Sequence, residues 1–357
     1  MMYSIPILLT SFLITFFITP FIILVAKRLN LIDDERRSHP ARVHIGSIPR
    51  AGGLAIYLGI VVSIFLFVDV TKSVVGILLA LTLLLIIGLA DDVKDINPYM
   101  RFLTNIAAAL LVVVGGISIP FILNPFTAQV FHLDAWRISF EFFGQHSFLP
   151  LANIAAIFWI VWTMNIVGWS SGVDGQLPGF VAISAVVLGL LSFRFLPTDP
   201  NQSIVIKLAF VTAGAFLGFL PFNFYPQKIM PGYSGKTLAG FMLATLAILA
   251  QGKVGTAILV LGVPMIDALY TFARRILRFR SPVWPDRGHL HHLLLSLGWG
   301  KRRIAIFYWL VSALLGVVAL TVTSKGKLFT ILIVIAWVGG IMGLAQIIKM
   351  LSKKKSY

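Results

Sequence analysis

Two adjacent carboxylates, Asp91 and Asp92, follow an apolar run directly in the stretch "LADDVKD". Neighbouring carboxylates repel each other, and the repulsion grows where the dielectric constant falls at a membrane boundary. The pair therefore indicates a cation bound between the two side chains. The alternative is a solvated helix end in which Lys94 balances the charge.

A glycine-rich stretch, "SSGVDGQLPG", places Asp174 between Gly172 and Gly175. Glycine lets the backbone approach a ligand closely, and exposed N–H groups can bind a phosphate. The alternative is a tight turn between two helices, in which the glycines serve the turn alone.

Two further glycine-rich stretches each carry a basic residue. In "IPRAGGLAI", Arg50 stands just before a glycine pair, where it either clamps a phosphate at a helix start or anchors the chain at the membrane surface. The stretch "PGYSGKTLAGF" carries Lys236. Asp267, in "GVPMIDALY", lies within an apolar run, where an acid is costly and indicates function. Its alternative role is an ion pair with Arg274.

Histidines gather in "PDRGHLHH", which contains Arg287, His289, His291 and His292. His289 and His292 share one helical face while His291 points elsewhere, so the stretch is a poor zinc signature. Imidazoles beside an arginine suit an anionic ligand such as a diphosphate better.

The composition of the chain decides which elements position these residues. Of its 357 residues, 58% are hydrophobic and 12% are charged, whereas soluble domains keep about a quarter of their residues charged. Apolar spans of about 17–25 residues recur along the whole length, as transmembrane helices require. The sequence therefore predicts an all-α, polytopic membrane protein. Because the chain has no cysteine, disulfides, a thiolate nucleophile and cysteine-ligated zinc are excluded.

About eleven transmembrane helices are expected, in a single integral membrane domain over residues 1–357. The expected spans are 4–26, 52–69, 74–90, 102–119, 151–168, 177–196, 203–222, 237–252, 254–273, 304–323 and 328–348. The external connection 120–150 contains Phe, Trp and Pro, which predicts a segment lying along the membrane interface rather than a soluble domain.

Basic residues are distributed unevenly between the two sets of connections. One set, which includes 27–51, 91–101 and 274–303, contains most of them. The other set contains only Lys72, Arg137, Arg194, Lys207, Lys253, Lys325 and Lys327. Because lysine and arginine collect in cytoplasmic loops, we expect the N-terminus outside and the C-terminus in the cytoplasm. The same rule accounts for the net charge of +16, so nucleic acid is not expected as a partner.

The candidate stretches lie far apart in the sequence, yet all fall on the predicted cytoplasmic side. This convergence predicts a single active site that faces the cytoplasm.

Taken in order, the stretches "HIGSIPRAGGLAIYLG", "GLADDVKD", "GVDGQLPG", "GVPMIDALYTFARR" and "SPVWPDRGHLHHLL" resemble the polyprenyl-phosphate N-acetylhexosamine-1-phosphate transferases. The resemblance covers about residues 30–300. It implies a multi-pass enzyme of the plasma membrane that starts a cell-envelope polysaccharide. Such an enzyme transfers a hexosamine 1-phosphate, here most similar to GlcNAc-1-phosphate, from a UDP-N-acetylhexosamine to a polyprenyl phosphate and releases UMP. The sequence leaves the oligomeric state open, a homodimer being one alternative.

Positions can be carried over from the family's motifs. Asp91 and Asp92 match its aspartate pair, which handles the metal and the lipid phosphate. Asn165 and Asp174 match two positions of its N-x-x-N-x-x-D-G-x-D-G loop. The resemblance thus implies Mg²⁺, with Mn²⁺ as the alternative, held by Asp92 and Asp174, and it implies catalytic roles for all three acids.

The basic loop of the family contacts the nucleotide-sugar and matches the "PDRGHLHH" stretch. The residues then expected to bind substrate are Arg50, Asn165, Gly175, Lys236, Arg287, His289, His291 and His292.

This sequence departs from the family pattern at acids that typical members carry. In the loop of Asn165 and Asp174, the family's second Asn falls on Gly168 and its first Asp on Ser171. In a different stretch, "MPGYSGKTLAGF", a metal-binding Asp of the family falls on Tyr233. We expect Lys236 to replace part of the missing metal function. The alternative reading is a non-catalytic relative that binds polyprenyl phosphate or nucleotide-sugar. A small-solute transporter would need ionisable residues at mid-membrane and an internal repeat, and only Asp267 offers anything of that kind.

Overall fold

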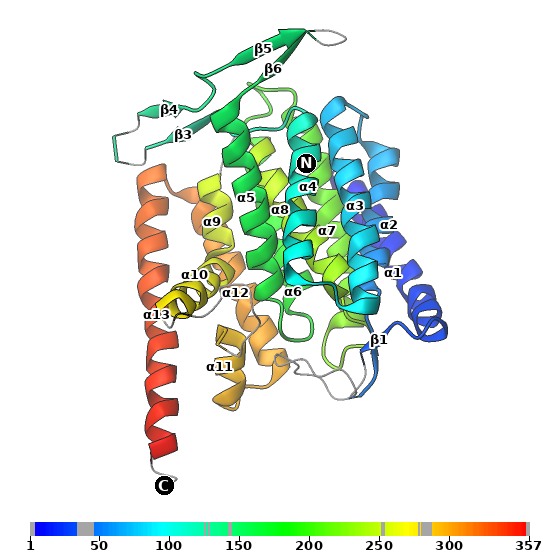
Figure 1. Cartoon of the computed structure of the whole chain (residues 1–357), viewed down its shortest axis with the longest axis vertical. Coiled ribbons are helices and arrows are strands. Elements are labelled where there is room, and N and C mark those ends of the chain that lie inside the picture. Colours follow the sequence, from blue (N-terminus) through cyan, green and yellow to red (C-terminus); the bar gives the residue numbers. More distant parts are fainter. Residues whose placement is uncertain are drawn as a thin grey trace.

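Long apolar helices, packed side by side, make up the body of the protein (Figure 1). The computed structural model describes residues 4–33, 46–124, 126–127, 129–141, 145–250, 254–277, 279 and 288–354. The helices are α1 (Ser4–Arg28), α2 (Gly52–Phe67), α3 (Lys72–Lys94), α4 (Pro98–Val114), α5 (Pro150–Trp169), α6 (Gln176–Phe193), α7 (Gln202–Asn223), α8 (Gly232–Leu249), α9 (Val254–Val260), α10 (Gly262–Leu277), α11 (Leu290–Ser296), α12 (Lys301–Thr321) and α13 (Ser324–Lys354).

The helices confirm the prediction of an all-α, polytopic membrane protein. Within the described residues, 7 helices are long and apolar enough to cross a membrane, or up to 8 if the bent pair α9–α10 counts as one span. The helices α2 and α4 are apolar but shorter. Each expected span overlaps a helix or the bent pair, while the count of about eleven crossings and the sidedness of the chain stay predictions.

Helix α1 has one face packed against the bundle and another face that is exposed and apolar. It buries small polar residues, among them Ser11 and Thr15, and it exposes Phe17 and Phe21. The hydroxyl of Ser11 donates a hydrogen bond of 2.7 Å to the carbonyl of Val211 on α7. Small residues let helices approach closely, while lipid tails accept an apolar outer surface. The outer face of α1 therefore suits lipid.

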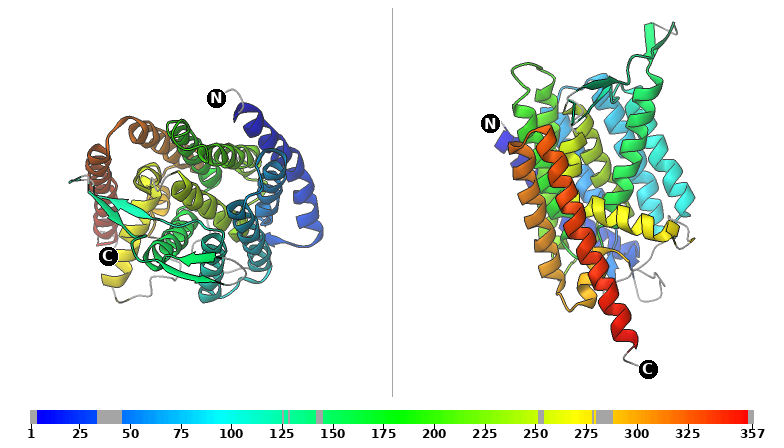
Figure 2. Two further views of the ribbon diagram at one scale, coloured as in Figure 1. Left: turned by 90° about the horizontal axis from the view of Figure 1, so that it is seen from above. Right: turned by 90° about the vertical axis from the view of Figure 1, so that its left-hand side faces the viewer.

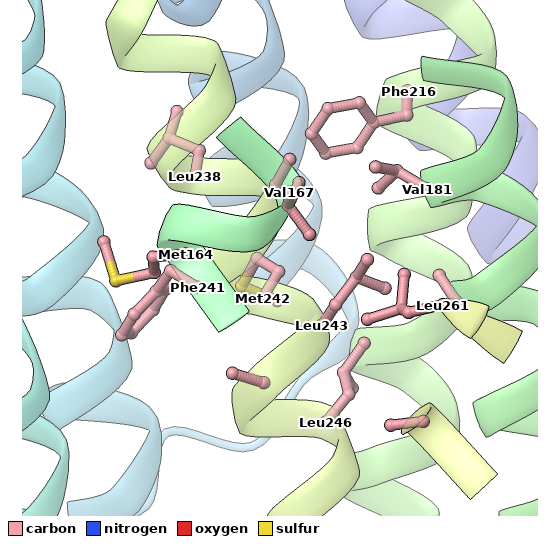
Figure 3. Close-up of a cluster of buried hydrophobic side chains, with 14 of the residues drawn as sticks. Met164, Val167, Val181, Phe216, Leu238, Phe241, Met242, Leu243, Leu246 and Leu261 are labelled. Carbon is pink, nitrogen blue, oxygen red and sulfur yellow. The ribbon is translucent and has the colours of Figure 1, made fainter. Parts of the chain in front are cut away.

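Helix α8 lies at the centre of the packing. It packs against α2, α3, α5, α6, α7 and α9, and all of its residues from 237 to 248 are buried. Figure 3 shows Phe241, Met242 and Leu243 of α8 among Met164 and Phe216 from α5 and α7. Because neighbouring helices surround the rest of α8, its first turn also has a fixed position in the bundle.

The ninth expected span, 254–273, is not one straight helix. It is broken into α9 and α10, which are bent by 85° to each other, so α10 turns across the bundle (Figure 2). Pro264 has no N–H, and its ring would clash with the carbonyl of Val260 four residues earlier if the helix continued. Helix α9 ends at that residue.

Short antiparallel strands occur at the two ends of the bundle. Strands β1 (Ile32–Asp33) and β2 (Ile48–Pro49) pair at the end where α11 lies. The connection 120–150 forms two hairpins at the opposite end (Figure 1), in which Phe121 faces His132 and Ile138 faces Phe148. The hairpins are β3 (Phe121–Leu123) with β4 (Val130–His132), and β5 (Ile138–Glu141) with β6 (Gln145–Phe148). Their position along the membrane interface stays a prediction.

Candidate functional site

The predicted aspartate pair lies at the end of α3, in a group that we call the acid cluster: Arg50, Asp91, Asp92, Arg101 and Tyr233. Asp92 is buried, and its two oxygens accept hydrogen bonds from the start of α8. The backbone N–H of Tyr233 donates at 2.7 Å, and the hydroxyl of Ser234 donates at 2.8 Å. Asp92 thus caps α8 from another helix, where the helix dipole also favours a negative charge.

Two arginines balance the aspartates. The Nε atom of Arg101 lies 2.5 Å from Asp91 Oδ1, and Nε of Arg50 lies 3.7 Å from Asp92 Oδ1. Asp95, one turn further on, also pairs with Arg50 at 3.2 Å. The second oxygen of Asp91, Oδ2, is buried without a hydrogen-bond partner among the described residues. It is the one carboxylate oxygen of the pair that stays available to a ligand.

Gly232 allows α8 to approach the aspartates this closely. Its φ of +69° is strained for other residues, and a Cβ there would lie 2.2 Å from the carbonyl oxygen of Arg50 and 2.3 Å from Asp92 Oδ2. The following residue, Tyr233, stacks its ring under the guanidinium of Arg101, whose carbon lies 5.0 Å from the ring centre. Tyr233 therefore fills space beside the pair instead of adding a third acid.

Lys236, in the first turns of α8, lies within electrostatic range of both the acid cluster and the histidines. It interacts electrostatically with Asp92 and Asp91 and with both arginines. It also interacts with His291, since the charge on Lys236 is one cause that lowers the pKa of His291. Within the part of the chain that the structure describes, Lys236 makes no hydrogen bond or ion pair. Its ammonium is thus not held by a carboxylate or carbonyl of the described residues.

The glycine-rich loop between α5 and α6 holds Asp174 against α12. The ammonium of Lys301 lies 3.2 Å from Asp174 Oδ1, and the N–H of Gln227 donates to Asp174 Oδ2 at 3.4 Å. The N–H of Gly175 donates to Asn223 Oδ1 at 3.1 Å. Gly175, at a φ of +76°, is the residue that precedes α6, so it serves the turn, and its role in substrate binding stays a prediction.

Around the start of α11 lies a second group, which we call the histidine cluster: Asp267, Thr271, His289, His291 and His292. Nδ1 of His289 lies 3.2 Å from Asp267 Oδ2. The rings of His289 and His291 stack with 5.8 Å between their centres, and those of His291 and His292 lie 4.3 Å apart. The partner of Asp267 is therefore His289, from the histidine stretch.

His291 joins this cluster to the loop of Asp174. A Cβ on Gly172 would lie 1.8 Å from His291 Nε2, so the ring rests directly on that glycine. Burial, followed by the neighbouring charges of His292, His289 and Lys236, lowers the pKa of His291 well below its usual value. Its Nδ1 atom is buried and has no hydrogen-bond partner among the described residues.

Two predicted residues stand apart from these contacts. The side-chain amide of Asn165 donates to the carbonyl of Val161, one turn back on its own helix, at 2.7 Å. Arg287 lies outside the described residues.

Sequence reasoning missed Arg101 and Lys301 as partners of the acids. Both were counted only as positive charges in cytoplasmic connections. Their pairing with Asp91 and Asp174 joins residues 10 and 127 positions apart, and the longer separation carries no local signal.

A divalent cation fits the acid cluster, although it would find few protein ligands. Within the described residues, no three histidine, aspartate or glutamate side chains form a ready metal site. Mg²⁺ commonly uses one or two carboxylates and completes its shell with water and phosphate oxygens. The buried, unbonded Oδ2 of Asp91 offers the oxygen that such an ion needs.

Comparisons with known proteins agree on one family. A family model described as glycosyl transferase family 4 matches residues 74–251. The chain is 30% identical over 331 residues to a decaprenyl-phosphate N-acetylglucosaminephosphotransferase of Mycobacterium tuberculosis, covering 85% of this chain and 78% of the relative. It is 27% identical over 337 residues to a probable undecaprenyl-phosphate N-acetylglucosaminyl 1-phosphate transferase of Bacillus subtilis, covering 92% and 88%. An Escherichia coli undecaprenyl-phosphate alpha-N-acetylglucosaminyl 1-phosphate transferase is 28% identical over 320 residues, covering 86% and 81%.

Proposed function

Because the chain belongs to glycosyl transferase family 4, a family of transferases, we propose that it transfers N-acetylglucosamine 1-phosphate to a polyprenyl phosphate. The donor is UDP-N-acetylglucosamine, and UMP is the leaving group. The names of the relatives support the acceptor lipid and the sugar.

The contacts that bring the two clusters near Lys236 carry this proposal: Asp92 binds the first turn of α8, the helix of Lys236, and His291 packs on Gly172 in the loop of Asp174. The charge of Lys236 acts both on Asp92 of the acid cluster and on His291 of the histidine cluster. A donor diphosphate and an acceptor phosphate must meet within a few ångströms for transfer. The two clusters supply one binding region for each, with the ammonium of Lys236 within electrostatic range of both.

The reaction forms one bond and breaks one. An oxygen of the lipid phosphate attacks the β-phosphorus of the UDP-sugar, and the bond between this phosphorus and the bridging oxygen breaks. That oxygen leaves with UMP, and the product is a lipid diphosphate that carries the sugar. Such transfers depend mostly on placement and charge neutralisation. Lys236 and the histidines supply positive charge and hydrogen-bond donors.

We propose Mg²⁺ as the cofactor, with Mn²⁺ as the alternative. Asp91 Oδ2 and Asp92 would hold it, and the ion would neutralise the charge of the diphosphate. Asp174 would be a ligand only after leaving Lys301, to which it is bound. Lys236 takes over part of the charge neutralisation that the acids absent at Ser171 and Tyr233 would support in relatives.

We also propose that the site faces the cytoplasm of the plasma membrane. Because the chain has no cysteine, single cysteines at two exposed positions form a clean test. A cysteine at Ser296 on α11 should react only with a membrane-impermeant thiol reagent applied from inside. One at Thr127 in the first hairpin should react only from outside. The opposite pattern would reverse the sidedness.

Exchange of labelled UMP into UDP-N-acetylglucosamine, in membranes that contain polyprenyl phosphate, tests the transfer directly. The proposed enzyme supports exchange that depends on the lipid and on Mg²⁺. The competing reading is a binding protein without activity, which Ser171 and Tyr233 favour. It predicts binding of UDP-N-acetylglucosamine without exchange, and exchange that appears once Ser171→Asp and Tyr233→Asp are combined.

A further inference from the structure

Asp267 is the fully buried acid of the histidine cluster, and the reaction outlined above gives it no role. We propose that Asp267 is a positioning residue: its carboxylate fixes the orientation of His289 and balances the charge of its protonated ring, so that the Nε2 N–H of His289 donates to an anionic oxygen of the diphosphate of the nucleotide-sugar. The inference rests on the proposed function for its ligand, and it concerns a residue that the family resemblance does not assign.

The two oxygens of Asp267 make two different contacts. Oδ2 lies 3.2 Å from Nδ1 of His289, and Oδ1 accepts the backbone N–H of Leu290 at 2.8 Å. The hydroxyl of Thr271, one turn further along α10, lies 3.5 Å from the same Nδ1. One carboxylate therefore holds both the ring of His289 and the first N–H of α11.

The carboxylate of Asp267 decides which nitrogen of His289 remains for a ligand. An ionised carboxylate only accepts hydrogen bonds, so Nδ1 of His289 must carry the proton. Nε2 makes no hydrogen bond with the described residues, which leaves it for a ligand. A phosphate oxygen is also an acceptor, so the ring binds it as an imidazolium with both N–H groups donating. Asp267 then balances the positive charge of that ring.

The bend between α9 and α10 makes this contact available. An acid within an apolar span is costly and needs a partner. The 85° bend turns α10 across the bundle, and α10 carries Asp267 to α11 from 22 residues earlier in the sequence. On the other side of His289, the ring of His291 stacks at 5.8 Å. The pair Asp267–His289 is thus formed by two elements, α10 and the start of α11, and neither element positions both side chains.

A double-mutant cycle on ligand binding tests the inference. The purified full chain and its variants Asp267→Asn, His289→Ala and the double substitution are titrated with UDP-N-acetylglucosamine. Asparagine keeps an acceptor for Leu290 but loses the charge and the preference for a proton on Nδ1. We expect each single substitution to weaken binding by about tenfold or more, the range for a lost hydrogen bond to a charged group. The double variant should be no weaker than His289→Ala alone, because Asp267 acts through that ring.

Two controls separate positioning from a general loss of structure. Asp199→Asn alters another acid, which accepts a hydrogen bond from Gln202 at 2.8 Å far from the histidines in the sequence, and it should leave binding unchanged. UMP lacks the second phosphate, so its affinity should change by less than about threefold in Asp267→Asn. Independent, multiplying effects of the two substitutions would overturn the inference, as would equal losses for UMP and the UDP-sugar. Since binding is measured without turnover, an inactive wild type that binds the UDP-sugar would refute the transfer activity alone.

Discussion

The acid cluster and the histidine cluster both lie within electrostatic range of Lys236, yet they balance their charges in different ways. Each aspartate of the acid cluster has its own cation: Arg101 for Asp91 and Arg50 for Asp92. In the histidine cluster, a single acid, Asp267, contacts one of three imidazoles, and His291 keeps a buried nitrogen without a partner among the described residues.

Because their charges are balanced differently, the two clusters are expected to bind different ligands. The acid cluster is close to neutral and held by the start of α8, so it keeps a fixed geometry and adds one free oxygen for a cation. In the histidine cluster, Nδ1 of His289 is bound to Asp267, so the other nitrogen of that ring is the proposed donor to an anion. In the proposed reaction, the histidine cluster would therefore bind the donor diphosphate through hydrogen bonds and charge, while the acid cluster would hold its groups in a fixed geometry.

The largest effect is expected from Asp92→Asn, which tests the fixed geometry of the acid cluster. The substitution keeps the shape of the side chain but removes the charge that caps α8 and faces Arg50. We expect the rate of UMP exchange to fall by about a hundredfold or more, as for other preorganised electrostatic groups. Asp95→Asn is the matched control, because Asp95 also pairs with Arg50 but is half-exposed, and its effect should stay within about threefold. Equal losses at both positions would mean that the buried aspartate has no special role.

Lys236→Ala tests the residue within electrostatic range of both clusters. Loss of the ammonium should lower exchange by about tenfold or more and make the remaining activity depend more steeply on Mg²⁺. Lys228→Ala, an exposed lysine from the connection before α8, should have little effect. Combining Ser171→Asp with Tyr233→Asp should sharpen the Mg²⁺ response of the wild type. A Lys236→Ala variant that behaves like wild type at every Mg²⁺ concentration would refute the compensation.

Gly172→Ala tests the histidine cluster, because Gly172 packs against the ring of His291. The added methyl group would sit 1.8 Å from His291 Nε2, so the ring must move, and such overpacking costs about 1–3 kcal/mol. We expect KM for UDP-N-acetylglucosamine to rise by about tenfold, with little change in KM for the lipid phosphate. Gly168→Ala adds the same methyl group in open space and should leave both constants unchanged. A rise in the lipid KM alone would reassign this loop to the acceptor.

The smallest effect is expected at an ion pair remote from both clusters. Lys207 lies 3.3 Å from Asp69, whose side chain is 84% exposed. Such pairs contribute about 0–1 kcal/mol to stability. Asp69→Asn should therefore change neither exchange nor KM, and it should shift the Tm only slightly. A clear loss of activity would show that charge matters over the whole molecule rather than in the two clusters.

Much of the site could be predicted from residue type and spacing. The pair Asp91–Asp92 and the histidine stretch were visible because their charges interrupt apolar sequence. The partners were not: Arg101 and Lys301 carry the same local signal as every other basic residue in a connection predicted to be cytoplasmic. Asp267 was expected to indicate function, and the only partner that the sequence could offer was the alternative one, Arg274 on the same helix, since periodicity reports only on neighbours along the chain. Its partner, His289, lies on another element.

The sequence predicted the helices because the lengths of the apolar runs indicate them. It did not predict the break before α10 or the strand pairing in 120–150, which depend on the backbone. The apolar run 254–273 is long enough for one span, so its length hid the break that Pro264 enforces. The hairpins in 120–150 form from pairings between segments, and apolar composition alone does not distinguish a paired strand from a chain lying at an interface.

The order of the helices along the chain has a consequence for biosynthesis. Every residue of the acid cluster, from Arg50 to Tyr233, precedes α9, while the histidine cluster and Lys301 come from α10 to α12. Chains emerge from the ribosome N-terminus first, at about 5–20 residues per second. The nascent protein can thus assemble its acid cluster early, but Asp174 meets Lys301 only after α12 has been started, and the histidine cluster needs both α10 and α11. Unfinished chains would therefore carry only the acid cluster, and the two clusters would come together late in synthesis.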